Sequence, residues 1–304
     1  MVFASRLLRR CALVAGMGAL ALQASTLPWG DGVNLQPSYF AEGHVTFGWS
    51  LMKEYPAIRT VRIEIEPSVP METATRWLRE AHAEGLRVIA TYHHYPYNGS
   101  DSAEELLNAA RWWRKNYAAL EAAAPGLIVN LMNEWGSHEQ TAETFAAAYN
   151  PAIAIVREVY AGPLIIDVPG WGQETYVARD ASKLLPDDNL VFSAHIYASG
   201  WVKQGPDRWM TADDLDALDE TGRPAIIGEF GGEREGESDW SGIVDYAREK
   251  KGWPLIAWAW NGDGERMNMV QPYWGDEPKA AHYTPHPYFQ KVYSKLRSPA
   301  PAPR

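Results

Sequence analysis

The chain has 304 residues, of which 46% are hydrophobic and 22% charged, and its formal net charge is −10. This length allows one large domain or two ordinary ones, and the composition excludes a disordered chain. The acidic balance argues against nucleic acid or an anionic membrane as a partner. The 14 tryptophans against 7 phenylalanines indicate surfaces that stack on flat rings or sugar faces, besides a core rich in tryptophan.

Residues 1–24 are predicted to be a signal peptide. Three arginines precede an apolar stretch over residues 11–21, and cleavage would follow Ala21 or Ala24. The stretch is too short for a convincing membrane span. Removing it takes away three arginines and no acid, which moves the net charge from −10 to −13. We therefore expect a secreted or periplasmic protein with no membrane partner after cleavage. Cys11 is the only cysteine, so no disulfide is expected in the mature chain.

Apolar runs typical of buried strands alternate with helical patterns over the rest of the chain. Helices are predicted at residues 49–55, 70–85, 102–124, 141–160, 174–184, within 207–219, 240–250 and 287–296. Strands are predicted at residues 29–35, 58–65, 86–92, 127–132, 163–168, 190–195, 225–229 and 254–260. Residues 298–304, SPAPAPR, are expected to be a disordered tail or the stub of a linker.

Eight strand–helix units over residues 25–297 predict a single α/β domain with the (β/α)8 TIM-barrel fold. The rival is a doubly wound open sheet. Such a sheet would be expected to show a glycine-rich phosphate loop after its first strand, and the chain has neither GxGxxG nor GxxxxGK. The barrel is therefore the favoured fold.

Two carboxylates stand at the ends of buried strands. Glu134 ends the apolar run in GLIVNLMNEWG, and Glu229 ends the run in PAIIGEFGG. One such glutamate alone could simply cap a strand-to-helix turn. In a barrel, however, the fourth and seventh strands end across the mouth from each other, which allows a separation of about 5 Å and retaining glycoside hydrolysis. One carboxylate would then attack the sugar and the other would transfer protons.

Other polar or aromatic residues fall at the same ends of strands. Arg62 is a candidate to keep a nucleophile ionised, Asn133 to bind a sugar hydroxyl, and Trp260 to stack under a sugar ring. His195 and Tyr197 could orient the carboxylates. Each also has a plain structural reading: an arginine inside a barrel needs an ionic partner in any case. Trp258 and Trp260 lie two residues apart on one strand face, so one of them can be core.

The histidine pair His93-His94 raises the possibility of a metal site. Adjacent residues on a strand point to opposite faces, which disfavours a shared metal. A metal-dependent amidohydrolase barrel would carry His-x-His on its first strand, and GVNLQ has none. No metal and no cofactor are expected, and sensitivity to a chelator would indicate otherwise.

The motifs TVRIEI, NLMNEWG, SAHIY, IIGEFGG and AWAWNG, in this order along the chain, resemble glycoside hydrolase family 5 over nearly the whole mature chain. The resemblance implies a retaining mechanism with Glu134 as acid/base and Glu229 as nucleophile. It also implies that six further positions belong to the active site: Arg62, His93, Asn133, His195, Tyr197 and Trp260. His94 would replace His93 if the alignment shifted by one residue.

Within that family, LIIDVPGWGQ and PAIIGEFGG are most similar to bacterial endo-β-1,4-mannanases, and the first adds Trp171 to the substrate-binding residues. The loops GVNLQPSYF and HHYPYNGS depart from the mannanase pattern. The resemblance therefore implies a β-1,4-mannanase, with a β-1,4-glucanase or an oligosaccharide hydrolase as alternatives. A non-catalytic carbohydrate-binding barrel is disfavoured because both glutamates are present. The expected partner is a polysaccharide, and the expected state is a monomer.

Overall fold

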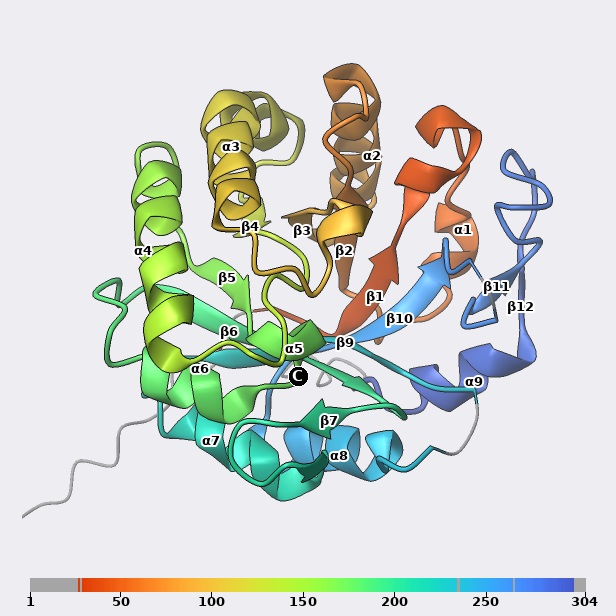
Figure 1. The fold of residues 1–304 in the computed structure, drawn as a ribbon. Helices are drawn as coiled ribbons and strands as arrows, with labels where there is room; N and C mark the ends of the chain where they lie inside the picture. Colours follow the sequence, from red (N-terminus) through yellow and green to blue (C-terminus); the bar gives the residue numbers. More distant parts are fainter. Residues whose placement is uncertain (1–26, 28, 234–235, 265, 298–304) are drawn as a thin grey trace, which may run out of the picture.

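The computed structural model describes residues 27, 29–233, 236–264 and 266–297. The predicted signal peptide and the 298–304 tail lie outside them. Eight parallel strands close into a barrel in the order β1-β10-β9-β6-β5-β4-β3-β2, as predicted (Figure 1). The barrel strands are β1 (Gly32–Leu35), β2 (Thr60–Ile65), β3 (Arg87–Tyr92), β4 (Ile128–Asn130), β5 (Leu164–Asp167), β6 (Leu190–Tyr197), β9 (Ala225–Gly231) and β10 (Leu255–Asn261).

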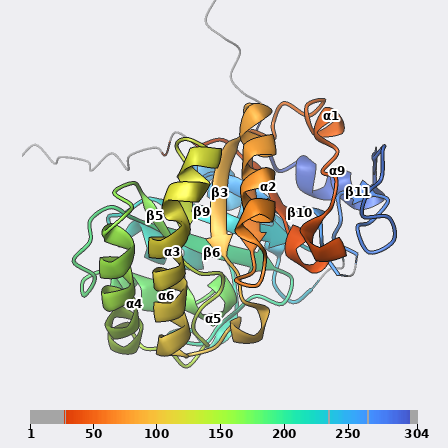
Figure 2. The ribbon, with the colours of Figure 1, turned by 90° about the horizontal axis from the view of Figure 1, so that it is seen from above.

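Helices surround the strands of the barrel (Figure 1), and the turned view shows several of these helices side by side along one flank of the barrel (Figure 2). Their local sequences explain their ends. The Ser102 side chain caps the helix that begins at Ala103 by accepting from Glu105 N, and the left-handed Gly85 (φ +80°) follows the helix that ends at Ala83. The helices are α1 (Trp49–Met52), α2 (Met71–Ala83), α3 (Ala103–Ala123), α4 (Ala142–Arg157), α5 (Pro169–Gly172), α6 (Thr175–Ala181), α7 (Asp216–Asp219), α8 (Trp240–Tyr246) and α9 (Pro287–Tyr293). No helix among the described residues is long and apolar enough to span a bilayer.

Two small hairpins and the four-residue helix α5 were not predicted. The hairpins pair β7 (Trp201–Val202) with β8 (Arg208–Trp209), and β11 (Val270–Gln271) with β12 (Thr284–Pro285). Strands of two residues leave no periodic apolar pattern to detect. The β7–β8 hairpin follows β6, so it belongs to the end of the barrel where the strands terminate.

The barrel interior has two layers of different character. Its lower layer is an apolar cluster of Trp29, Ile89, Ile128, Ile165, Val191, Ile226 and Ile256. Alternate residues of a strand share a face, so positions two residues further along point into the same interior. Several of those positions are polar and buried, among them Asn130, Asp167 and Ser193. The polar layer lies at the carboxyl ends of the strands and forms the floor of the site described next.

Candidate active site

Glu134 stands four residues past the end of β4, in a turn that fixes its backbone. Its φ is +47°, which is rare for a residue other than glycine. Its N–H donates to Asp167 Oδ2 (3.0 Å), and its carbonyl accepts from Gly99 N (2.7 Å). The residue is only 9% exposed. These bonds from neighbouring strand ends hold Glu134 in place at the mouth of the barrel.

Glu229 lies within β9 and faces Glu134 across the mouth. Its side chain accepts hydrogen bonds from Arg62 Nη1 (2.8 Å) and Tyr197 Oη (2.6 Å). The pairing of β6 with β9 shifts between Ala194 and His195, which sets His195 beside Glu229. The hydrogen bonds from Arg62 and Tyr197 both favour the ionised form of the Glu229 carboxyl, which is the form that a nucleophile requires.

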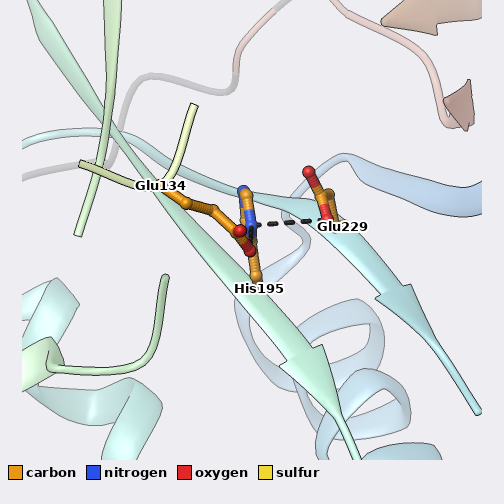
Figure 3. Close-up of side chains that lie close together, drawn as sticks. All are labelled: Glu134, His195 and Glu229. Carbon is orange, nitrogen blue, oxygen red and sulfur yellow. Dashed lines mark hydrogen bonds and ion pairs between the residues drawn. The ribbon is translucent and has the colours of Figure 1, made fainter. Parts of the chain in front are cut away.

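His195 lies between the two glutamates (Figure 3). Its Nδ1 is 2.9 Å from Glu134 Oε1 and 3.5 Å from Glu229 Oε2, and its Nε2 is 3.5 Å from Asp167 Oδ2. One carboxylate oxygen of each glutamate and one histidine nitrogen all lie within 4.8 Å of one another. The spacing falls in the short range of retaining glycosidases, whose carboxyl groups are about 5 Å apart, and well below the range of inverting ones.

Arg62 is fully buried beneath the pair and connects five groups of the polar layer. Its guanidinium donates to side-chain oxygens on β1, β2, β4, β9 and the turn after β4. The partners are Asn34 Oδ1 (3.0 Å), Glu64 Oε1 (2.9 Å), Asn130 Oδ1 (2.9 Å), Glu229 Oε1 (2.8 Å) and Asn133 Oδ1 (2.6 Å). A buried cation with every donor directed at an acceptor fixes the geometry of the carboxylates around it.

Burial raises the pKa of Glu229 to about 7; the charges of His195 and Arg62 oppose this rise, and the charge of Glu134 adds to it. Burial lowers the pKa of His195, but Glu229, Asp167 and Glu134 outweigh it and bring the value to about 9. The Glu229 carboxyl therefore loses its proton as the pH rises through about 7.

A cavity of about 500 Å³ opens above these groups. Five of the predicted site residues line it: His93, Asn133, Glu134, Tyr197 and Glu229. The rest of its wall comes from the loops after β1 and β3, from β10, and from the loop after β10. Those further lining residues are Gln36, Tyr39, Phe40, Tyr95, Asn98, Trp258, Gly262, Asp263 and Gly264. Arg62 and His195 lie beneath it and reach the glutamates directly.

Comparison with known proteins places this architecture in a family. A family model described as cellulase (glycosyl hydrolase family 5) matches residues 56–264, which is more than half of the chain. The chain belongs to glycosyl hydrolase family 5. The matched segment contains both glutamates, most of the polar layer beneath them, and most of the residues lining the cavity.

Two curated relatives carry the name mannan endo-1,4-beta-mannosidase. The Streptomyces lividans protein is 33% identical over 57% of this chain and 46% of its own length, and the Cellvibrio japonicus protein is 24% identical over 64% and 45%. This family 5 chain thus spans about half the length of the curated relatives it matches. The catalytic domain of a mannanase from Streptomyces sp. SirexAA-E shares the fold, with a TM-score of 0.68, 24% identity, and coverage of 88% of this chain and 84% of its own.

Trp260, predicted to stack under a sugar, lies outside the cavity of this family 5 barrel. It is fully buried, its Nε1 donates to Phe47 O (2.8 Å), and its ring packs on Phe289 of α9. Trp258 lines the cavity instead, and Asp263 Oδ1 accepts from its Nε1 (2.8 Å). The two tryptophans do not share a face because β10 is irregular here: β1 advances two residues, Val33 to Leu35, while β10 advances four.

The histidine pair separates as alternation on a strand predicts. His93 lines the cavity, with Nδ1 2.6 Å from Tyr39 Oη and 3.2 Å from Glu66 Oε1. His94 turns to the helix side, where its Nδ1 is 2.6 Å from Glu105 Oε1. The cavity position is thus that of His93, and the two rings do not face a common metal. The residues whose donor atoms converge are Glu134, His195 and Glu229, which could ligate a cation.

Several residues of the site escaped the sequence analysis. Asp167 and Asn130 interrupt apolar strands, and both bond across the floor, with Asn130 Nδ2 3.2 Å from Asp167 Oδ1. Glu64 holds Gln36 Nε2 (2.7 Å) as well as Arg62. A polar residue inside an apolar strand was the available signal, since a barrel interior tolerates one only when it is paired. Trp171 is 40% exposed and does not line the 500 Å³ cavity.

Proposed function

We propose that the chain is a retaining endo-β-1,4-mannanase that works by double displacement. The observation that carries the proposal is the close approach of Glu134 and Glu229, with an oxygen of each within 4.8 Å. That spacing leaves no room for a water between carboxylate and sugar, which inversion would require. The names of the two curated relatives support mannan as the substrate.

In the first step Glu229 attacks the anomeric carbon, and the bond to the leaving oxygen breaks. Arg62 and Tyr197 stabilise the ionised Glu229 before attack. Glu134, which must carry a proton for this step, passes it to the leaving oxygen as that bond breaks. The products are a covalent sugar ester on Glu229 and a free sugar end, which leaves from the Glu134 side.

In the second step Glu134 is an ionised base. It takes a proton from a water, the water oxygen bonds to the anomeric carbon, and Glu229 leaves as a carboxylate. His195, 2.9 Å from Glu134 Oε1, keeps that carboxylate aligned through both steps. Two inversions give net retention, and the water proton replaces the one that Glu134 gave up in the first step.

The alternative is a β-1,4-glucanase with the same chemistry, which the cellulase name of the family model favours. The two are separated by assaying sugar release from β-mannan, glucomannan and carboxymethyl-cellulose in parallel, with Glu229→Gln as control. Mannan activity that the variant lacks supports the proposal, and activity on cellulose alone refutes its substrate. Activity that disappears with a chelator and returns with added metal would refute the metal-free mechanism.

We also propose export, since residues 1–24 have the pattern of a signal peptide. Fractionation of cells that express the full chain tests this. A shortened protein outside the cytoplasm supports export, and an uncleaved cytoplasmic protein contradicts it.

A further inference from the structure

Two glycines bring Trp171 close to His195 and to the backbone of Glu134. A Cβ on Gly172 would lie 2.5 Å from His195 Cβ, so the backbone beside Trp171 packs directly on His195. A Cβ on Gly99 would lie 2.1 Å from the Trp171 ring, and Gly99 N donates to Glu134 O (2.7 Å). Trp171 therefore lies on the side of the mouth where Glu134 stands.

The backbone of Trp171 is held in an unfavourable conformation while its ring stays accessible. Its φ is +54°, between Gly170 at +65° and Gly172 at +79°. A bulky side chain rarely adopts left-handed values, and such residues persist only where the surroundings fix them. Nevertheless the side chain is 40% exposed. A strained and exposed aromatic beside a proton donor indicates a binding surface.

A buried carboxylate, Glu174, provides the fixing contacts. It is fully buried and accepts from the backbone N–H groups of Lys203 (2.8 Å) and Gln204 (2.9 Å). Its Oε1 also lies 2.5 Å from His138 Nδ1. Gln204 is also bonded to His138 directly, because its Nε2 donates to His138 O (2.7 Å). One side chain thus ties together the segments that follow β4, β5 and β6.

His138, which Glu174 holds in place, packs in turn on Trp171. Its ring packs on the Trp171 ring with centroids 5.3 Å apart and planes at 41°. A Cβ on Gly170 would lie 2.5 Å from His138 Nδ1 and 2.6 Å from Glu174 Cγ. The left-handed glycine therefore lets the His138–Glu174 pair press against the backbone that carries Trp171.

We propose that Trp171 is the platform for the sugar on the leaving-group side, and that Glu174 and His138 are its positioning residues. The inference rests on the proposed function, in which Glu134 donates a proton to the leaving sugar. A sugar bonded to that oxygen lies on the Glu134 side, where the flat face of Trp171 can stack on it. The same surface would bind an acceptor sugar that attacks the covalent intermediate in place of water.

The test compares two substrates with the same glycone. One is a β-1,4-manno-oligosaccharide, which fills the leaving-group side, and the other is the matching β-glycosyl fluoride, whose leaving group is a single atom. The variants are Trp171→Ala, His138→Ala and Glu174→Gln, with His138→Gln as a conservative variant that keeps a donor for Glu174. His82→Ala, on α2 away from the mouth, is the matched control.

We expect Trp171→Ala and His138→Ala to lower kcat/KM for the oligosaccharide by roughly tenfold, mainly through KM, because one stacking contact is lost or misplaced. The change for the fluoride should stay within about twofold. Glu174→Gln should behave similarly, because an amide must set its NH2 group against one of three N–H donors. His138→Gln should recover part of the loss, and the ratio of sugar transfer to hydrolysis should fall with kcat/KM.

Equal losses on both substrates would reduce the cluster to a stabilising role and overturn the inference, as would no loss on either. A wild-type protein inactive on mannan but active on glucan would refute only the mannan assignment, and cello-oligosaccharides with their fluorides then test the platform. Wild-type activity on neither polymer nor fluoride would refute both proposals.

Discussion

The two layers of the barrel interior are built from the same strands and do opposite work. In the lower layer Ile165, Val191 and Ile226 pack against one another with no polar atoms. Two or three residues further along these strands stand Asp167, Ser193 and Glu229, in a layer of charges and hydrogen bonds. Burying apolar groups stabilises a fold, whereas burying charges costs free energy unless each is paired.

The lower layer of this barrel contributes stability, and the upper layer contributes the reactive groups. Local apolar patterns in the sequence are enough to form the lower layer. The upper layer depends on contacts such as Arg62 to Glu229, which join residues 167 positions apart. Substitutions in the two layers should therefore separate activity from stability.

The largest expected effect is on activity, from the two glutamates of the upper layer. Glu229→Gln should lower kcat/KM by more than roughly 10⁴-fold on any substrate, since the covalent step is lost. Glu134→Gln should lose about 10²- to 10⁴-fold on oligosaccharides but much less on glycosyl fluorides, whose leaving group needs no proton. Thermal unfolding should show both variants folded, and equal losses on the two substrates would contradict the acid/base role of Glu134.

The reverse pattern is expected from the lower layer. Ile165→Ala should lower the free energy of unfolding by about 2–5 kcal/mol, because it leaves a cavity in a fully buried cluster. The folded fraction should keep its kcat. Denaturant unfolding and steady-state kinetics measure the two quantities, and a large loss of kcat with unchanged stability would break the division of labour between the layers.

The pH profile tests the ionisation of Glu229. Lowering the pH through about 7 protonates this carboxyl, because burial raises its pKa to that value. We expect kcat/KM to fall about tenfold per pH unit below that value, since a protonated carboxyl cannot attack the sugar. His195 stays protonated up to about pH 9, so it does not titrate in this range, and a profile that stays flat below pH 7 would contradict the assignment of Glu229 as the nucleophile.

The two tryptophans of β10 distinguish a residue that lines the cavity from one that belongs to the core. Trp258→Ala should raise KM roughly tenfold with little change in stability, because its ring lines the cavity. Trp260→Ala should instead lower the free energy of unfolding by about 3–5 kcal/mol. Measuring KM and unfolding for both decides it, and a KM effect from Trp260 in a stable protein would restore the sequence-based assignment.

The sequence predicts some features of the barrel and its site better than others. The strands, the barrel and the two glutamates follow from apolar runs that end in a polar residue, a local signal. Tyr39 and Glu66 bond to His93 from other strand ends, and no local pattern announces such contacts. The position of Trp260 at the end of the last strand, together with the family resemblance, predicted it in the site. Regular alternation predicted that Trp258 shares its face, and the irregular pairing of β10 breaks that regularity.

Five predicted site residues converge at the cavity or its floor, although their chemical roles stay predictions: Glu134, Glu229, Arg62, Asn133 and Tyr197. The sequence did not predict the contact between Glu174 and His138, because the β7–β8 hairpin that Glu174 binds is too short to leave a pattern. Sequence reasoning thus finds the groups at strand ends and misses the loops that orient them.

The central claim is the retaining mechanism, and the anomeric configuration of the first product tests it most directly. Proton NMR during hydrolysis of a β-1,4-manno-oligosaccharide, before mutarotation, reports which anomer appears first. The close carboxylates predict that the β anomer forms first and the α anomer only by slow equilibration. An α anomer formed first would mean single displacement by water and would contradict the assignment of Glu229 as the nucleophile.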